Sequence, residues 1–138
     1  MNILKRFSIK TQGFSDIINI TENVQNIILN YAPENNGIVN IFSPGATGAI
    51  TTIEYEKGLL SDLKTYLEKI FPYNGNYKHH LAWNDDNGAS HLRASLIGPS
   101  LVVPFENKKL LLGTWQQIVF IDFDTTPRNR NIIVTIIV

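Results

Sequence analysis

The chain has 138 residues, of which 43% are apolar, and it carries 12 basic and 12 acidic side chains. This length and apolar content predict one globular domain over residues 1–138, able to bury about two-thirds of the surface of its unfolded chain. Charges are balanced within both halves, so the sequence lacks the basic stripe that nucleic-acid binding requires. No cysteine is present, which excludes disulfides, thiolate chemistry and cysteine-type zinc sites.

The first ten residues, MNILKRFSIK, lack the apolar core of a signal peptide. No window elsewhere reaches the about 18 consecutive apolar residues of a membrane-spanning helix. We therefore expect a soluble, cytoplasmic protein with neither a nucleic acid nor a membrane as its partner.

The first half of the chain alternates strand and helix signals. Residues Ile3–Thr11 alternate in polarity as an opening strand does. Thr21 is a suitable N-cap for a helix that Pro33 ends. Two β-rich runs and a second amphipathic helix follow, at Ile38–Ser43, Ala49–Tyr55 and Leu59–Phe71.

The second half is predicted to be almost entirely β. Its short apolar runs are separated by Gly, Pro and Asn turns and lie at Leu92–Ile97, Ser100–Phe105, Lys109–Leu112, Trp115–Asp124 and Asn131–Val138. The last run is apolar on both faces, which predicts a central strand or a strand whose second face another subunit covers. Together the elements predict an α+β fold, with mostly antiparallel, sandwich-like sheets and two main helices.

All three histidines lie between Tyr77 and Arg93, in the segment YKHHLAWNDDNGASHLR. Imidazoles with a carboxylate can exchange protons or bind a divalent metal such as Zn or Mg, although a solvated polar loop would have the same composition. If this segment is extended, His79 and His80 point to opposite sides, so at most one of them shares a site with His91. The segment therefore offers His91, one of His79 and His80, and the carboxylates Asp85 and Asp86 as metal ligands or acid–base groups.

Three further places offer candidate groups, each with a purely structural alternative. Glu54 closes a β-branched strand, where it is either solvated or placed over a site. Trp115 and Gln116 form either core and strand edge or an aromatic wall with an amide donor for a ligand. Arg128 and Arg130 are either solvated or placed to bind phosphate. No nucleotide-binding loop or nucleophile elbow is present in the sequence.

These residues together resemble the YjbQ family, also called UPF0047. The resemblance runs from about Val39 onward and is strongest in NGNYKH, in DDNGASHLRASLIGPSLVVPF and in LLLGTWQQIVFIDFD. It implies an α+β fold, a homotrimer, a pocket with the family's histidines and a metal, and an activity like that of a secondary thiamine-phosphate synthase.

Carried over by position, the resemblance implies catalytic roles for His79, His91, Glu54 and Asp86 and leaves His80 as the weaker candidate. It implies that His79, His91 and Asp86 are the metal ligands. It implies substrate contacts for Thr47, Trp115, Gln116, Arg128 and Arg130. One departure concerns the loop before Ala49, where many members have His-Thr and this chain reads PGAT, with Gly45 in place of the histidine.

The leading hypothesis is therefore a small-metabolite enzyme acting on a phosphorylated or pyrophosphorylated substrate. The first alternative, favoured by Gly45, is a non-catalytic trimeric ligand-binding or assembly module. The second is a metal-dependent phosphohydrolase that uses the same residues.

Overall fold

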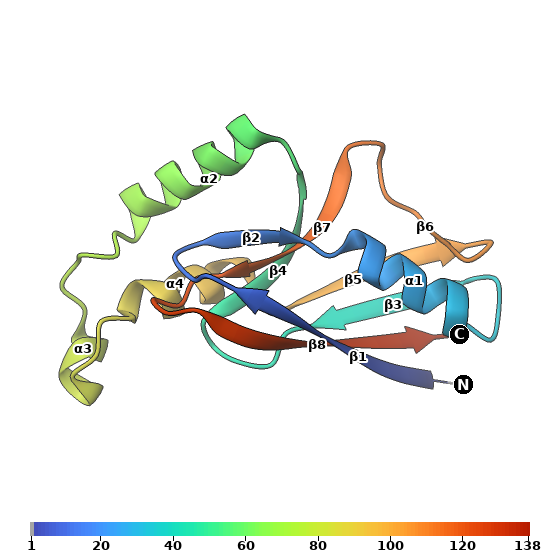
Figure 1. Ribbon diagram of the computed structural model, residues 1–138, viewed down its shortest axis with the longest axis horizontal. Helices are drawn as coiled ribbons and strands as arrows, with labels where there is room; N and C mark the ends of the chain where they lie inside the picture. Colours follow the sequence, from blue (N-terminus) through green and yellow to red (C-terminus); the bar gives the residue numbers. More distant parts are fainter. Residues whose placement is uncertain (1) are drawn as a thin grey trace.

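A computed structural model describes residues 2–138, which form two antiparallel sheets and four helices (Figure 1). The large sheet has, in spatial order, β1 (Asn2–Thr11), β8 (Arg128–Ile137), β3 (Gly37–Phe42), β5 (Ser100–Glu106) and β6 (Lys109–Leu110). The small sheet has β2 (Asp16–Asn19), β7 (Gln116–Asp122) and β4 (Gly48–Glu54). The helices are α1 (Thr21–Tyr31), α2 (Lys57–Ile70), α3 (Lys78–Trp83) and α4 (Gly88–Ile97). The predicted α+β class is confirmed.

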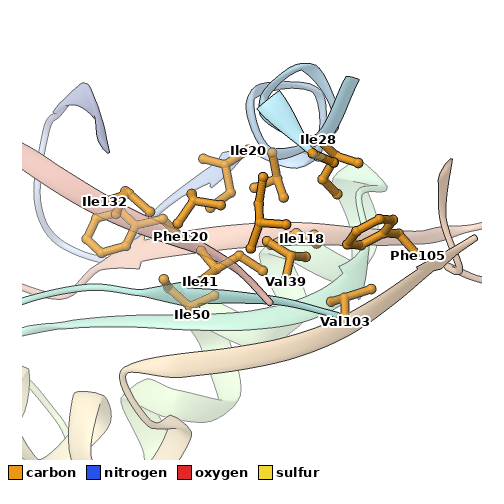
Figure 2. Packing of buried hydrophobic residues seen from close by; sticks show 14 residues of the cluster. Ile20, Ile28, Val39, Ile41, Ile50, Val103, Phe105, Ile118, Phe120 and Ile132 are labelled. Atoms are coloured by element: carbon orange, nitrogen blue, oxygen red, sulfur yellow. The ribbon is translucent and has the colours of Figure 1, made fainter. Parts of the chain in front are cut away.

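Strand β7 separates the two parts of the hydrophobic core. Ile118 and Phe120 point into the space between the sheets, which α1 closes on one side (Figure 2). Val119 and Ile121 point the other way, against α2 and α4. A strand covered on both faces must be apolar throughout, and each such fully buried side chain contributes about 1.5–3 kcal/mol to folding.

Strand β8 is central, as its sequence predicts. It lies between β1 and β3, so that Ile136 is opposite Ile3 on one side and Val39 on the other. One face of β8 is buried in the core. Its other face belongs to the outer surface of the large sheet, which neither hydrophobic cluster of residues 2–138 covers.

The segment around the histidines differs from the prediction. Leu92–Ile97, expected as a strand, forms the end of α4, and the expected loop contains α3. Apart from Arg93, the buried residues of α4 are small, and a Cβ on Gly88 would lie 2.6 Å from Tyr77 at the start of α3. Close packing around α4 therefore decides its conformation against the local β signal. No helix in residues 2–138 has the length and apolar character needed to cross a membrane.

Candidate functional site

The structure brings together the two histidines that the sequence pairs. His79 is on α3 and His91 is on α4, and their rings meet edge to face with centroids 4.5 Å apart and planes inclined by 60°. They are twelve positions apart in the sequence, and the short turn between the two helices folds one helix back onto the other.

Asp85, in that turn, is the carboxylate that approaches the pair. Asn84 ends α3 in the left-handed conformation, with φ of 53°, and so reverses the chain direction. This places Asp85 Oδ2 3.5 Å from His79 Nε2. The side-chain amide of Asn87 faces both groups, with one polar atom 3.2 Å from His79 Nε2 and 3.1 Å from Asp85 Oδ1.

Asp86, the carboxylate chosen from the sequence, is held elsewhere. It accepts a hydrogen bond of 3.1 Å from the Thr125 hydroxyl, on the loop between β7 and β8. Within residues 2–138, no three His, Cys, Asp or Glu side chains come close enough to bind one metal ion. The set His79, His91 and Asp86 is therefore corrected: adjacent residues of a tight turn point in different directions, and here the first aspartate faces the imidazole.

His80 has a structural role. Its Nε2 accepts a 3.0 Å hydrogen bond from the backbone N–H of Gly88, the first residue of α4, and its ring packs edge to face on Tyr77. This satisfies one of the backbone donors that a helix N-terminus leaves free. The expectation that only one of the two neighbouring histidines joins His91 agrees with the structure, but both are on a helix rather than a strand.

A pocket of about 450 Å³ opens beside the histidine pair. Its lining residues are Asn76, Tyr77, Lys78, His79, Gly88, His91 and Leu92. It is thus bounded by one ammonium group, by two imidazoles and by the N-terminal end of α4, whose partial positive charge favours anions. An apolar wall with a few convergent polar groups is the usual form of a small-molecule site.

Arg130 does not present a free charge to a ligand. Its guanidinium donates two parallel hydrogen bonds to Asp122, from Nε to Oδ2 at 2.9 Å and from Nη2 to Oδ1 at 2.8 Å. Burial alone would raise the pKa of the Asp122 carboxyl, but hydrogen bonds from Arg130, Thr11 and the Asp124 N–H hold that pKa below its usual value. Hydrogen bonding to Asp122 in turn raises the pKa of Arg130.

Arg128 is the more accessible of the two arginines. It pairs with Asp124, with Nε 3.0 Å from Oδ2, and half of its side chain is exposed. The sequence placed both arginines in a turn, whereas they begin β8, beside the buried end of β7. Carboxylates of the same chain pair with both arginines, and their expected role in neutralising phosphate stays a prediction.

Thr47 and Gly45 lie beside the ion pairs that Arg130 forms with Asp122 and Arg128 forms with Asp124. The Thr47 hydroxyl accepts from Arg130 Nη2 at 2.8 Å and donates to Asp124 Oδ2 at 3.3 Å. A Cβ built on Gly45 would meet one atom within 4 Å, Arg130 Nη1, at 3.4 Å. Gly45 also has φ of +122°, which L residues rarely adopt. The loop in which many family members have histidine thus lies against Arg130 here.

Glu54, Trp115 and Gln116 lie at the opposite end of the small sheet. In the register of β4 with β7, Gly48 pairs with Asp122 and Glu54 pairs with Gln116. Six residue steps along a strand span about 20 Å. Gln116 closes its own loop by accepting from the Gly113 N–H at 3.0 Å, and Glu54 and Trp115 are exposed. A single copy of the chain therefore does not place these residues with the histidines.

Sequence reasoning named Asp85 beside Asp86 but chose Asp86, and it missed Asn87, Tyr77 and Lys78 as site residues. Asp85 and Asn87 could have been chosen together, because side chains at i and i+2 of a tight turn can share one side. Tyr77 and Lys78 gave no chemical pattern of their own. They reach the pocket because α3 begins there.

The fold and pocket define a class, a two-sheet α+β domain with a histidine pair on two short helices. The family model "UPF0047 protein YjbQ-like" matches residues 5–138, so the chain belongs to the YjbQ family. A UPF0047 protein from Archaeoglobus fulgidus is 42% identical over 127 residues, covering 92% of this chain and 95% of that protein. One from Methanothermobacter thermautotrophicus is 41% identical over 128 residues, covering 93% and 87%.

Solved structures agree with this assignment. A YbjQ-like protein of unknown function from Sulfolobus solfataricus superposes with a TM-score of 0.87 at 31% identity, covering 99% of this chain and 98% of that one. An uncharacterised YjbQ/UPF0047 protein from Clostridium acetobutylicum gives 0.87 at 36% identity, covering 96% and 99%. The family and fold are thereby shown, and neither description states an activity.

Proposed function

We propose that the chain is an enzyme for a small phosphorylated or pyrophosphorylated metabolite, with the pocket beside His79 and His91 as its active site. The observation that carries the proposal is the 4.5 Å contact of two imidazoles, from separate helices, at the wall of a pocket of about 450 Å³. Titratable side chains that converge at a pocket are the first candidates for binding or catalysis.

The surroundings of the pocket support an anionic substrate. Lys78 and the N-terminus of α4 supply positive charge where Arg128 and Arg130 do not. Transfer or hydrolysis at a phosphate or pyrophosphate leaves negative charge on the departing group, which positive groups stabilise. An imidazole can give a proton to that group or take one from the attacking group. A thiamine-phosphate synthase-like transfer is one reaction of this class.

The test is ligand binding by calorimetry and thermal shift, with pyrophosphate, hydroxymethylpyrimidine diphosphate and thiazole phosphate as probes. His79→Ala and His91→Ala should each weaken binding about tenfold or more. His80→Gln is the matched control, since a Gln oxygen can still accept from Gly88 and the pocket wall is unchanged. Binding that survives both alanine variants, or no binding of any probe by the folded protein, would overturn the proposal.

Two activities of this class can be separated by their products. A synthase-like transfer joins two substrates and releases pyrophosphate, whereas a phosphohydrolase releases phosphate from a simple ester in water alone. Assaying both products with the wild type and the two alanine variants assigns the reaction type to the histidine pocket.

A second candidate function, a trimeric binding or assembly module, is favoured by the outer face of the large sheet. Its exposed apolar side chains are Leu4, Ile38, Phe42, Val102 and Ile137. They lie side by side, because Ile38 pairs with Ile137 and Val102 pairs with Asn40, next to them. Exposed apolar patches of this kind mark interaction surfaces. We propose that further copies of the chain cover this patch.

Sedimentation equilibrium tests the assembly. The wild type should have three times the chain mass, and Ile38→Lys with Val102→Lys should reduce it to one. A monomeric wild type would exclude the module. A trimer that ignores every phosphate probe would favour it over the enzyme.

A further inference from the structure

A second pocket lies where β4 ends and α2 begins, and the proposed function leaves its residues unused. Its volume is about 500 Å³. The aromatic and charged residues that line it are Glu54, Tyr55, Glu56 and Trp115, and its other lining residues are uncharged. It shares no lining residue with the pocket beside His79 and His91, so the two cavities are separate.

Trp115 forms an aromatic wall of this pocket, on a turn whose conformation is fixed. The N–H of Gln116 donates to the Gly113 carbonyl at 3.0 Å, and the Gln116 side-chain oxygen accepts from the Gly113 N–H at 3.0 Å. The side-chain nitrogen of Gln116 donates to Thr52 Oγ1, on β4, at 3.1 Å. The backbone that carries Trp115 is thus held in place, while the residue itself is 71% exposed. A wall that is ordered before a ligand arrives costs little entropy to use.

The described residues that line this pocket carry two negative charges and no positive one. Glu54 forms no ion pair within residues 2–138. Glu56 accepts the Leu59 N–H at 2.6 Å as the N-cap of α2, and the dipole of that helix partly offsets its charge. Lys57, the next residue, lines a different pocket. The main uncompensated charge is therefore that of Glu54, which repels phosphate and attracts a cation.

We propose that this pocket binds a small organic cation, an alkylated ammonium group, with its alkyl groups on the indole of Trp115 and its charge beside Glu54. The face of an indole attracts cations more strongly than the face of Tyr or Phe does. Tyr55, whose hydroxyl donates to the Ile17 carbonyl at 2.7 Å, adds a second fixed ring. A metal cation such as Mg²⁺ keeps its bound water and gains little from aromatic walls. The inference goes beyond the proposed function, because it uses no residue of the histidine pocket.

Tetramethylammonium is the probe, and the fluorescence of Trp115 reports its binding. The chain has two tryptophans, so the measurement is made in Trp83→Phe, which leaves Trp115 as the single reporter. Tetramethylammonium chloride should change the fluorescence in a saturable way. Sodium chloride at the same ionic strength and tert-butanol, a neutral molecule of similar shape, should not. A response to either control that equals the response to tetramethylammonium, or no saturable response at all, would overturn the inference.

Substitutions then assign the two parts of the site, with affinities measured by saturation-transfer NMR on the methyl protons of the probe. Trp115→Leu should weaken binding about fivefold or more. Glu54→Gln should weaken it about threefold, and Glu34→Gln is the matched control, because that exposed carboxylate does not line the pocket. Both pocket residues are exposed, so neither change should unfold the chain.

His79→Ala tests whether the two cavities are independent. This variant should bind tetramethylammonium as the wild type does, since His79 lines the other pocket. Loss of cation binding in His79→Ala, or equal affinities in Glu54→Gln and Glu34→Gln, would contradict a separate cation site. Pyrophosphate binding at the histidine pocket enters none of these measurements, so either proposal can fail without the other.

Discussion

The guanidinium of Arg130 and the carboxylate of Asp122 form a two-bond ion pair at the junction of the sheets, with the carboxylate fully buried and the arginine 12% exposed. A buried charge without its partner is strongly unfavourable, so removing one member costs more than the pair gains. The pair holds the start of β8 against the end of β7, next to the loop that contains Thr47.

Arg130→Gln should lower the free energy of unfolding by about 3–5 kcal/mol. Arg128→Gln is the comparison and should cost less, because half of the Arg128 side chain is exposed and buried Asp124 keeps Thr47 and Arg130 as neighbours. Urea denaturation measures both. Equal losses of unfolding free energy would show that the Arg130–Asp122 pair is no more important than the half-exposed Arg128–Asp124 pair.

Asp122 should make stability fall in acid. Its pKa in the folded protein lies below the usual value of 3.8. The unfolded chain therefore takes up the proton first, and the stabilisation is complete above about pH 3.8 and is lost as pH falls through the lower folded-state pKa. Unfolding free energies measured between pH 6 and 2 should decline less steeply in Asp122→Asn than in the wild type. Parallel curves would contradict the assignment.

Arg93 should be among the residues most costly to replace. It is 1% exposed, donates to the Phe71 carbonyl and to Ser15 Oγ, and pairs with Glu68 at 2.6 Å. Arg93→Met would remove both donors to the Phe71 carbonyl and the buried partner of Glu68, and it should destabilise the protein by about 3 kcal/mol or more. Glu68→Gln, on a half-exposed partner, should cost about 1 kcal/mol. Circular dichroism during thermal unfolding distinguishes the two.

His80 should matter for stability and not for the ligand. His80→Ala removes the acceptor for the Gly88 N–H, and loss of such a helix cap costs about 0.5–2 kcal/mol. The affinity for pyrophosphate should stay within a factor of two, measured well below the melting temperature. A large loss of affinity in this variant would place His80 in the active site.

Ser90 should be replaceable at no cost. Within residues 2–138 its hydroxyl is the buried side-chain polar atom that has no hydrogen-bond partner. Burial of an unpaired hydroxyl is unfavourable by about 1–3 kcal/mol, so Ser90→Ala should leave the free energy of unfolding unchanged or raise it. A clear loss of stability would indicate that the hydroxyl has a partner in solution.

The elements that the sequence predicts correctly carry strong local signals. The β5–β6 hairpin follows from its turn, where Asn107 and Lys108 both have positive φ, as the tight turns of hairpins require. The central position of β8 follows from its two apolar faces. Short β2 was missed because four residues are too few for a pattern, and α4 was mistaken for a strand because its Leu and Ile residues also fit a β run.

The sequence by itself determined the family, the α+β class and the pairing of His79 with His91, because composition, periodicity and motif spacing are local properties of the chain. The tertiary structure alone decided which neighbours those groups have. It turned Asp85 toward His79 and Asp86 toward Thr125, and it neutralised the arginines with Asp122 and Asp124. Such choices depend on side-chain directions and on contacts between residues distant in sequence, which no spacing along the chain encodes.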